Sequence, residues 1–270
     1  MPVPRVLVLR APGTNCDAET AYAFERTGGQ ADRVHLFRLI ESPSLLEDYQ
    51  ILVFAGGFSY GDDVGAGVIF GQQLRSHLVD ALKKFVEAEK LVLGICNGFQ
   101  ILMRSGLLPG GIEEWPAEED DPPVATLTWN SHGRYVDRWV RVAVSTDHCP
   151  FLRGMTTLDL PIAHAEGRIA VRNKAALAHW RFCGQIALQY VAPDQKMSSD
   201  LELLPEPINP NGSTANIAGL CDPTGRILGL MPHPERFQDA IQHPSWTRHG
   251  DGSGTGAGLQ LFQNAVSYFG

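Results

Sequence analysis

The sequence predicts an α/β protein whose central sheet is mostly parallel and lies between layers of helices. Across residues 5–100, short apolar runs alternate with segments whose apolar residues recur at helical spacing. The runs are apolar throughout, which is typical of parallel strands buried on both faces. Right-handed crossovers then bring the carboxyl ends of these strands to one edge of the sheet, where ligands bind in such folds.

The first half of the chain reads as strand, loop and helix in repetition. Residues 5–9 form the first apolar run, and residues 17–26 predict a helix that stops at the two glycines 28–29. Strands are predicted at residues 33–38 and 51–54. One helix is predicted from Gln72 onward, because its apolar positions lie on one face: Leu74, Leu78, Leu82, Phe85 and Val86.

The second half is richer in predicted strands. Residues 113–123 are acidic and contain prolines, which favours a solvated surface insertion. Residues 193–214, including a second insertion near 193–206, predict a long polar loop, and the glycine-rich residues 250–258 precede a closing helix at 259–268. Strands at 124–130, 139–145, 164–171 and 185–191 are predicted to form a second sheet or a mixed extension of the first. Two further short strands are predicted at 216–221 and 227–231.

Length and composition indicate one domain over residues 1–270 in a reducing compartment. The chain has 22 basic and 30 acidic residues, a net charge of −8, and no basic run, which argues against a nucleic-acid partner. Its five cysteines are scattered without a C-x-x-C pair, which argues against a disulfide framework and a zinc site. No signal peptide or bilayer-spanning run is evident, so we expect a cytoplasmic protein with no membrane partner.

The most informative stretch is residues 91–100, Leu-Val-Leu-Gly-Ile-Cys-Asn-Gly-Phe-Gln. An apolar strand turns directly into a helix at Cys96, with Gly94 and Gly98 on either side, which is the pattern of a nucleophile elbow. A helix N-terminus also favours a thiolate. An isolated cysteine in an apolar run is ordinarily a core residue, but the paired glycines and the change from strand to helix favour a nucleophile.

A cysteine nucleophile needs a base and a group that orients the base. His233 follows the predicted strand 227–231 and can therefore reach the same edge as Cys96, and Glu235 can orient it. Pro232 and Pro234 restrict the backbone on either side. Taken alone, His233 would read equally well as a histidine in a proline-rich turn, whereas together with the elbow a triad is favoured.

Glycines after the strand at 51–54 suggest an oxyanion hole. The N–H groups of Gly57 and Asn97 are the candidate donors, against the alternative of an ordinary glycine turn. The spacing is neither G-x-G-x-x-G nor G-x-x-x-x-G-K-[ST], so no dinucleotide or ATP site is expected. His164 and Glu166 lie outside any H-E-x-x-H pattern, and we predict no metal in this chain.

Several stretches of the sequence resemble a known family. The stretches 94–100 and 232–235 are similar to the class I (triad) glutamine amidotransferases. Further stretches resemble the glutaminase subunits of phosphoribosylformylglycinamidine synthase, the PurQ type: Pro-Gly-Thr-Asn-Cys-Asp at 12–17, Gly-Gly-Phe-Ser-Tyr-Gly-Asp at 56–62, Gly-Leu-Leu-Pro-Gly at 106–110, Ile-Ala-His-Ala-Glu-Gly at 162–167, Asn-Pro-Asn-Gly-Ser at 209–213, Ile-Ala-Gly at 217–219 and Gly-Leu-Met-Pro-His-Pro-Glu-Arg at 229–236.

This resemblance implies a flavodoxin-like, doubly wound fold and a role in purine biosynthesis. Cys96 would attack the amide of L-glutamine to form a γ-glutamyl thioester, while His233 moves the proton and Glu235 orients His233. The residues expected to contact bound glutamine are Gly57, Phe58 and Gln100, with Asn130 and Ser131 near its α-amino and carboxylate groups.

The resemblance also implies partners. Ammonia would pass to a separate ATP-dependent synthetase subunit that converts formylglycinamide ribonucleotide to formylglycinamidine ribonucleotide, with a small accessory subunit in the complex. ATP and Mg²⁺ would bind the synthetase, and this chain would hold no cofactor. Ala165 stands where the family pattern suggests glycine. Two alternatives remain: an amidotransferase serving another acceptor, and a catalytically silent interaction subunit.

Overall fold

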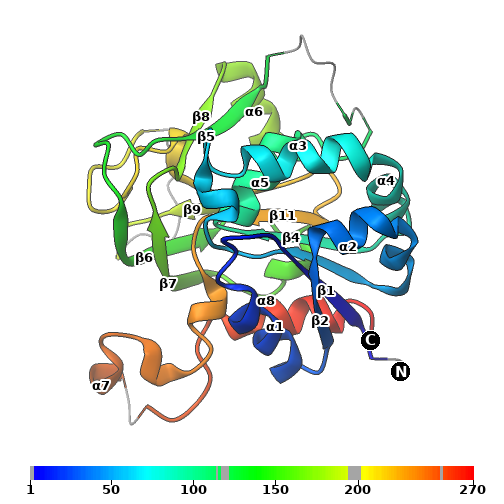
Figure 1. Cartoon of the computed structure of the whole chain (residues 1–270). Coiled ribbons are helices and arrows are strands. Elements are labelled where there is room, and N and C mark those ends of the chain that lie inside the picture. The colour runs from blue at the N-terminus through cyan, green and yellow to red at the C-terminus, as the bar shows by residue number, and fades with distance from the viewer. Residues whose placement is uncertain (1–2, 114, 117–121, 194–201, 250–251) are drawn as a thin grey trace.

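A nine-stranded sheet runs through the molecule, with helices on both of its faces (Figure 1). The structure is a computed structural model, and it describes residues 3–113, 115–116, 122–193, 202–249 and 252–270. The strand order is β2-β1-β3-β4-β11-β10-β9-β6-β7. The predicted α/β class is therefore confirmed.

Five neighbouring strands are parallel: four come from the first half of the chain, where the apolar runs predicted them, and β11 comes from the second half. They are β2 (Gln30–His35), β1 (Arg5–Arg10), β3 (Ile51–Phe54), β4 (Leu91–Ile95) and β11 (Ile227–Leu230). With β11 as the fifth strand this is the 2-1-3-4-5 order of flavodoxin-like folds. Every residue of β3, β4 and β11 is buried, which explains their unbroken apolar sequences.

The β-rich second half extends this sheet with antiparallel strands. They are β10 (Ile217–Cys221), β9 (Ile186–Tyr190), β6 (Val136–Val144) and β7 (Thr157–His164). A separate two-stranded sheet pairs β5 (Ala125–Thr128) with β8 (Arg168–Val171). Both arrangements considered from the sequence, a mixed extension and a second sheet, are thus present.

Helices cover the two faces of the parallel strands. On one face lie α1 (Asp17–Arg26) and α8 (Leu259–Ser267), and on the other lie α3 (Val68–His77), α4 (Val79–Glu87) and α5 (Asn97–Ser105) (Figure 1). The short α2 (Leu36–Glu41) follows β2, and α6 (Lys174–Phe182) precedes β9. The segment with α7 (Trp246–His249) projects away from the body of the molecule (Figure 1).

Several predicted boundaries were wrong. The helix expected from Gln72 is two helices, because Leu78 leaves helical geometry with φ −124° and ψ 12°. The strand expected at 33–38 begins at Gln30 and gives way to α2 at Leu36. The strand expected at 164–171 combines the end of β7 with β8, and no prediction was made for α6.

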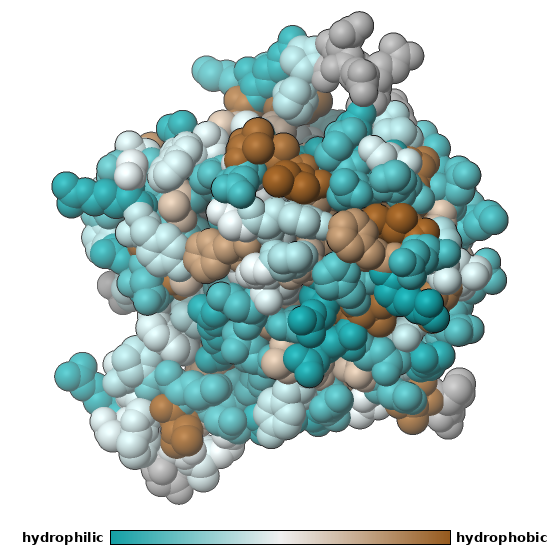
Figure 2. Space-filling model, in the orientation of Figure 1, coloured by the Kyte–Doolittle hydropathy of each residue, from teal (hydrophilic) through white to brown (hydrophobic). Residues whose placement is uncertain are grey.

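The structure describes only parts of the predicted surface segments. Of the predicted insertions, residues 114, 117–121 and 194–201 lie outside them, as do 250–251 of the glycine-rich segment. Figure 2 shows polar and apolar residues interspersed over the visible face, with small hydrophobic clusters. Within the described chain, no helix combines the length and apolar character needed to cross a membrane.

Candidate active site

Cys96 lies at a sharp corner between β4 and α5, as the sequence predicted. Its backbone has φ +51° and ψ −105°, a conformation that is uncommon for a residue with a side chain. The Cys96 N–H donates to the Leu230 carbonyl at 2.8 Å, and the Gln100 N–H donates to the Cys96 carbonyl at 3.0 Å. The surrounding strand and helix therefore hold Cys96 in a strained conformation of the kind that clusters at functional sites.

The glycines beside Cys96 are required by close packing. A Cβ on Gly94 would lie 2.6 Å from Leu102 Cδ1, and a Cβ on Gly98 would lie 1.8 Å from the Phe54 carbonyl oxygen. Real Cβ atoms do not approach other atoms so closely. Gly98 thus lets α5 begin directly over β3, which fixes where the cysteine points.

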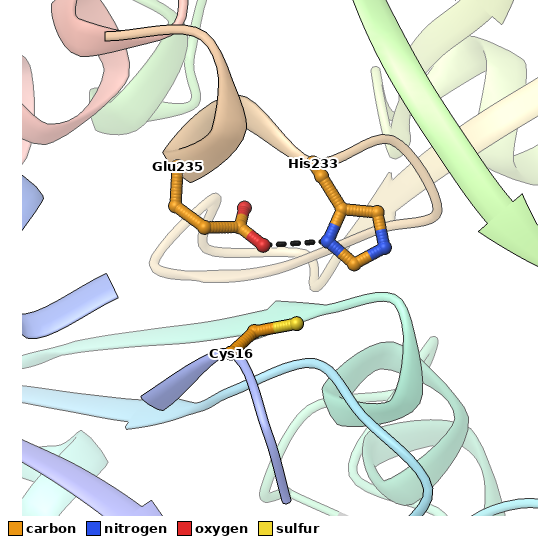
Figure 3. Close-up of side chains that lie close together, drawn as sticks. All are labelled: Cys16, His233 and Glu235. Carbon is orange, nitrogen blue, oxygen red and sulfur yellow. Dashed lines mark hydrogen bonds and ion pairs between the residues drawn. The ribbon is translucent and has the colours of Figure 1, made fainter. Parts of the chain in front are cut away.

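His233 and Glu235 form a buried pair at the end of the neighbouring strand. They flank the start of the short helix Pro234–Arg236 that follows β11, and His233 Nδ1 lies 2.5 Å from Glu235 Oε1 (Figure 3). His233 is 2 % exposed and Glu235 1 %. Burial opposes a charged imidazole, but the Glu235 carboxylate and Cys96 outweigh it and raise the pKa of His233 well above its usual value.

His233 and Cys96 both follow the carboxyl ends of neighbouring parallel strands. β4 and β11 are parallel neighbours in which Ile95 pairs with Leu230, and the two functional segments follow directly. Among the described residues, His233 Nε2 is buried without a hydrogen-bond partner, which leaves it free for a proton from a nearby group. Sγ of Cys96 also lies 3.6 Å from the Ala163 carbonyl of β7.

The Gly56-Gly57-Phe58 loop follows β3 and lies on the same edge. Gly57 has φ +140°, and a Cβ there would lie 2.6 Å from the Asn15 nitrogen. The Phe58 N–H donates to the Gly13 carbonyl at 2.9 Å, so this loop packs on the segment after β1. Asn97 is the first residue of α5, where an N–H has no intrahelical acceptor.

Polar side chains tie this loop to the first turn of α5. Asn97 Nδ2 donates to Asp62 Oδ1 at 3.2 Å and to Gln100 Oε1 at 2.9 Å, and Asn97 Oδ1 accepts from the Ser59 N–H at 3.1 Å. Gln100 Nε2 in turn donates to the Glu166 carbonyl at 2.7 Å. Burial and the nearby Glu166 raise the pKa of Asp62 to about 6. Neither Asp62 nor Glu166 was singled out as a site residue from sequence.

The side-chain amide of Asn130 makes all of its hydrogen bonds to other groups of the protein. Its Nδ2 donates to the carbonyls of Arg134 and His164, and its Oδ1 lies 3.1 Å from both His164 Nδ1 and the Gly167 nitrogen. Burial lowers the pKa of His164 to about 3, so this ring is neutral and donates from Nδ1. The amide therefore organises the turn after β7, while Ser131 beside it is exposed.

That turn also explains part of the 162–167 motif. A Cβ on Gly167 would lie 2.2 Å from His164 Cε1, so glycine is required there. Ala165, which replaces the expected glycine, contributes its carbonyl to the Asn130 N–H at 2.8 Å. A backbone carbonyl is available from any residue, so alanine supports the same contact.

Sequence reasoning missed Cys16 and Tyr135. Cys16 is fully buried, and its sulfur lies with one ligand atom each of His233 and Glu235 inside a 4.8 Å group (Figure 3). Such a group could hold a metal. Its ligand atoms already have partners, however, because His233 and Glu235 are hydrogen-bonded to each other and Arg236 donates to the sulfur at 3.0 Å. The absence of a metal stays a prediction, and the 12–17 motif was the signal that could have found Cys16.

Tyr135 forms part of the surroundings of Cys96 on the open side. Its ring stacks on that of Phe58 with centroids 6.4 Å apart, and both rings are exposed. Partial burial and the nearby Cys96 raise the pKa of Tyr135. No sequence pattern distinguishes this tyrosine, because it reaches the site through the fold alone.

Comparison with known proteins assigns this arrangement to a class. Residues 3–269 match the CobB/CobQ-like glutamine amidotransferase domain, and the chain belongs to that family. Within it, the chain is 42 % identical to phosphoribosylformylglycinamidine synthase subunit PurQ of Dehalococcoides mccartyi, over 98 % of this chain and 97 % of that protein. It is 37 % identical to the PurQ subunit of Archaeoglobus fulgidus, over 98 % and 96 %.

Solved structures agree. A chain in the structure of PurLQS from Thermotoga maritima matches with a TM-score of 0.69 and 29 % identity, covering all of both chains. The glutaminase domain of Trypanosoma brucei CTPS matches with a TM-score of 0.53 at 14 % identity, over 98 % of this chain and 94 % of that chain, which bears on the fold alone. The resemblance read from the motifs is confirmed.

Proposed function

We propose that this chain is the glutaminase subunit of a phosphoribosylformylglycinamidine synthase in purine biosynthesis. The observation that carries the proposal is a cysteine at a strained strand-to-helix corner, beside a buried His–Glu pair, in a chain that is 42 % identical to a PurQ subunit over nearly its whole length. The chain hydrolyses L-glutamine and delivers ammonia to a separate synthetase subunit, in the cytoplasm.

In the first step the sulfur of Cys96 attacks the side-chain amide carbon of glutamine. His233 takes the thiol proton and Glu235 stabilises the resulting imidazolium, in agreement with the raised pKa of His233. The N–H groups of Gly57 and Asn97 stabilise the developing oxyanion. His233 then returns the proton to the departing nitrogen, so that ammonia leaves and a γ-glutamyl thioester remains.

In the second step water attacks the thioester with His233 as general base, which releases glutamate and restores the thiol. Phe58 and Gln100 contact the bound glutamine, and Ser131 offers a hydroxyl near its α-carbon. We place Asn130 behind this surface, since its amide is already saturated by Arg134, His164 and Gly167.

The partners follow from the division of chemistry. The similar chain from Thermotoga maritima was solved in a structure of PurLQS, which supports a synthetase subunit and a small accessory subunit for this chain. ATP and Mg²⁺ bind the synthetase, and this chain needs no cofactor because each step above uses only its own groups.

The function is tested by reconstituting the complex with wild-type or Cys96→Ala chain and supplying either glutamine or ammonium chloride. We expect the variant to lose glutamine-dependent synthesis of formylglycinamidine ribonucleotide and to keep ammonium-dependent synthesis. If the variant carried out glutamine-dependent synthesis at a rate comparable to wild type, Cys96 would not be the nucleophile. A wild-type chain that supports amination of a different acceptor would instead favour another amidotransferase, and one that never hydrolyses glutamine would favour a silent subunit.

A further inference from the structure

The sulfur of Cys16 lies close to the buried pair of His233 and Glu235. It follows β1, immediately precedes α1, and is fully buried. In Figure 3 its sulfur points toward the space between the His233 ring and the Glu235 carboxylate. The proposed mechanism assigns no step to this thiol.

The imidazole has little room on this side. A Cβ placed on Gly56 would lie 2.9 Å from His233 Cε1 and 3.2 Å from Cys16 Sγ. The ring edge, the sulfur and the Gly56 backbone therefore meet in one small volume. The hydrogen bond from Nδ1 to Glu235 fixes only one atom of the ring, so these contacts limit its remaining tilt.

The sulfur is itself held from two directions. Arg236 donates to it from Nη2 at 3.0 Å, and the sulfur lies 3.3 Å from Asn15 Oδ1, which accepts from the thiol. Arg236 Nε also donates to Glu19 Oε1 at 2.9 Å. Since Glu19 lies on α1 and Arg236 follows the catalytic histidine, this chain of contacts ties the two segments together.

The thiol is neutral in this setting. Burial raises the pKa of Cys16, although contacts with His233 and Arg236 oppose the shift. A protonated thiol suits the hydrogen bond to Asn15. It also adds no negative charge beside Glu235, which keeps the carboxylate as the charge that the imidazolium faces.

We propose that Cys16, held by Arg236, is a positioning residue that keeps the His233 imidazole oriented for proton transfer in glutamine hydrolysis. This inference rests on the function proposed above. Misplacing a general base by a fraction of an ångström slows proton transfer without altering how substrate binds.

The test uses the reconstituted complex with Cys16→Ala and Cys16→Ser. We expect Cys16→Ala to lower the glutamine-dependent kcat by roughly 10- to 100-fold while KM for glutamine stays within about twofold. Cys16→Ser should restore most of the loss, because a hydroxyl can still accept from Arg236 and donate to Asn15. Ammonium-dependent synthesis should be unchanged in both.

The matched control is Cys221→Ala, which truncates an equally buried cysteine on β10. Cys221 pairs with Leu228 of β11, five residues before His233, so it lies away from the catalytic pair. We expect it to lower thermal stability without changing kcat. Should Cys16→Ala fold poorly, Arg236→Met supplies the same test, since it removes the donor to the sulfur and should lower kcat at constant KM.

Three results would overturn the proposal: an unchanged kcat in Cys16→Ala, an increase in KM as the main effect, or a serine variant no better than the alanine variant. Failure of the proposed function is separate, because it would appear as a wild-type chain unable to use glutamine or as an active Cys96→Ala variant.

Discussion

The backbone at Gly57 combines two requirements that no side chain satisfies. Its φ of +140° lies where residues other than glycine are strained, and a Cβ would collide with the Asn15 nitrogen and, at 2.8 Å, with the Gly13 carbonyl oxygen. Any substitution must therefore move the loop. Because the same residue offers its N–H to the proposed oxyanion, the movement has a chemical cost.

We expect Gly57→Ala to lower the glutamine-dependent kcat about 100-fold or more, the usual effect of losing one oxyanion donor. Gly154→Ala is the control, since Gly154 also has positive φ (+73°) but no atom within 4 Å of its Cβ position. That variant should lose about 1 kcal/mol of stability and no activity. Steady-state kinetics and thermal melts separate the two. Equal kinetic effects would argue against the oxyanion role.

At the scale of elements, the parallel strands were predictable and several connections were not. The strands β3, β4 and β11 are buried on both faces, so their sequences carry an unambiguous apolar signal. Helix α2 and the break at Leu78 carry none, because their residues remain compatible with a strand or with a continuous helix and packing decides between them.

The site divides in the same way. Cys96 and His233 follow strand ends in sequence, so the parallel topology alone places them together. Cys16 is also close to a strand end, but the role proposed for it depends on a contact with Arg236, which lies 220 residues further along the chain. Tyr135 arrives from the antiparallel extension, whose register the sequence left open.

The loop between β3 and α3 carries a half-buried acid, Asp62, that should make stability depend on pH. The folded state raises the pKa of Asp62 from 3.8 to about 6, through burial and then Glu166. Between these values the folded protein binds a proton that the unfolded chain has lost, so stability from this group is greatest below about pH 4 and falls as pH rises through 6.

We therefore expect Asp62→Asn to raise Tm at pH 8, by about 2–4 °C, and to have less effect at pH 5, where Asp62 is already protonated. The substituted amide oxygen can still accept from Asn97. Asp63→Asn on the exposed neighbouring residue is the control and should leave Tm unchanged at both pH values. A larger gain at pH 5 than at pH 8 would contradict the assignment.

At the scale of the whole molecule, the proposed catalytic residues and their neighbours lie on segments that follow β1, β3, β4, β7 and β11. Two exposed aromatic rings, Phe58 and Tyr135, stack on each other near Cys96. If the chain passes ammonia to a synthetase subunit, as proposed, that partner would cover these rings.

We expect the isolated chain to hydrolyse glutamine slowly and the synthetase partner to raise kcat, because docking would order the Gly57 loop against substrate. Glutaminase assays with and without the partner test this. High activity of the purified single chain, unchanged on adding the synthetase, would show that the site is already complete.

The central claim is that Cys96, and no other thiol, carries the glutamyl group. The direct measurement is rapid acid quenching of the complex during glutamine turnover, followed by peptide mass mapping of all five cysteines. We predict one γ-glutamyl adduct, on the peptide that contains Cys96. An adduct on the peptide that contains Cys16, or glutamine turnover by the Cys96→Ala chain without an adduct, would contradict this account.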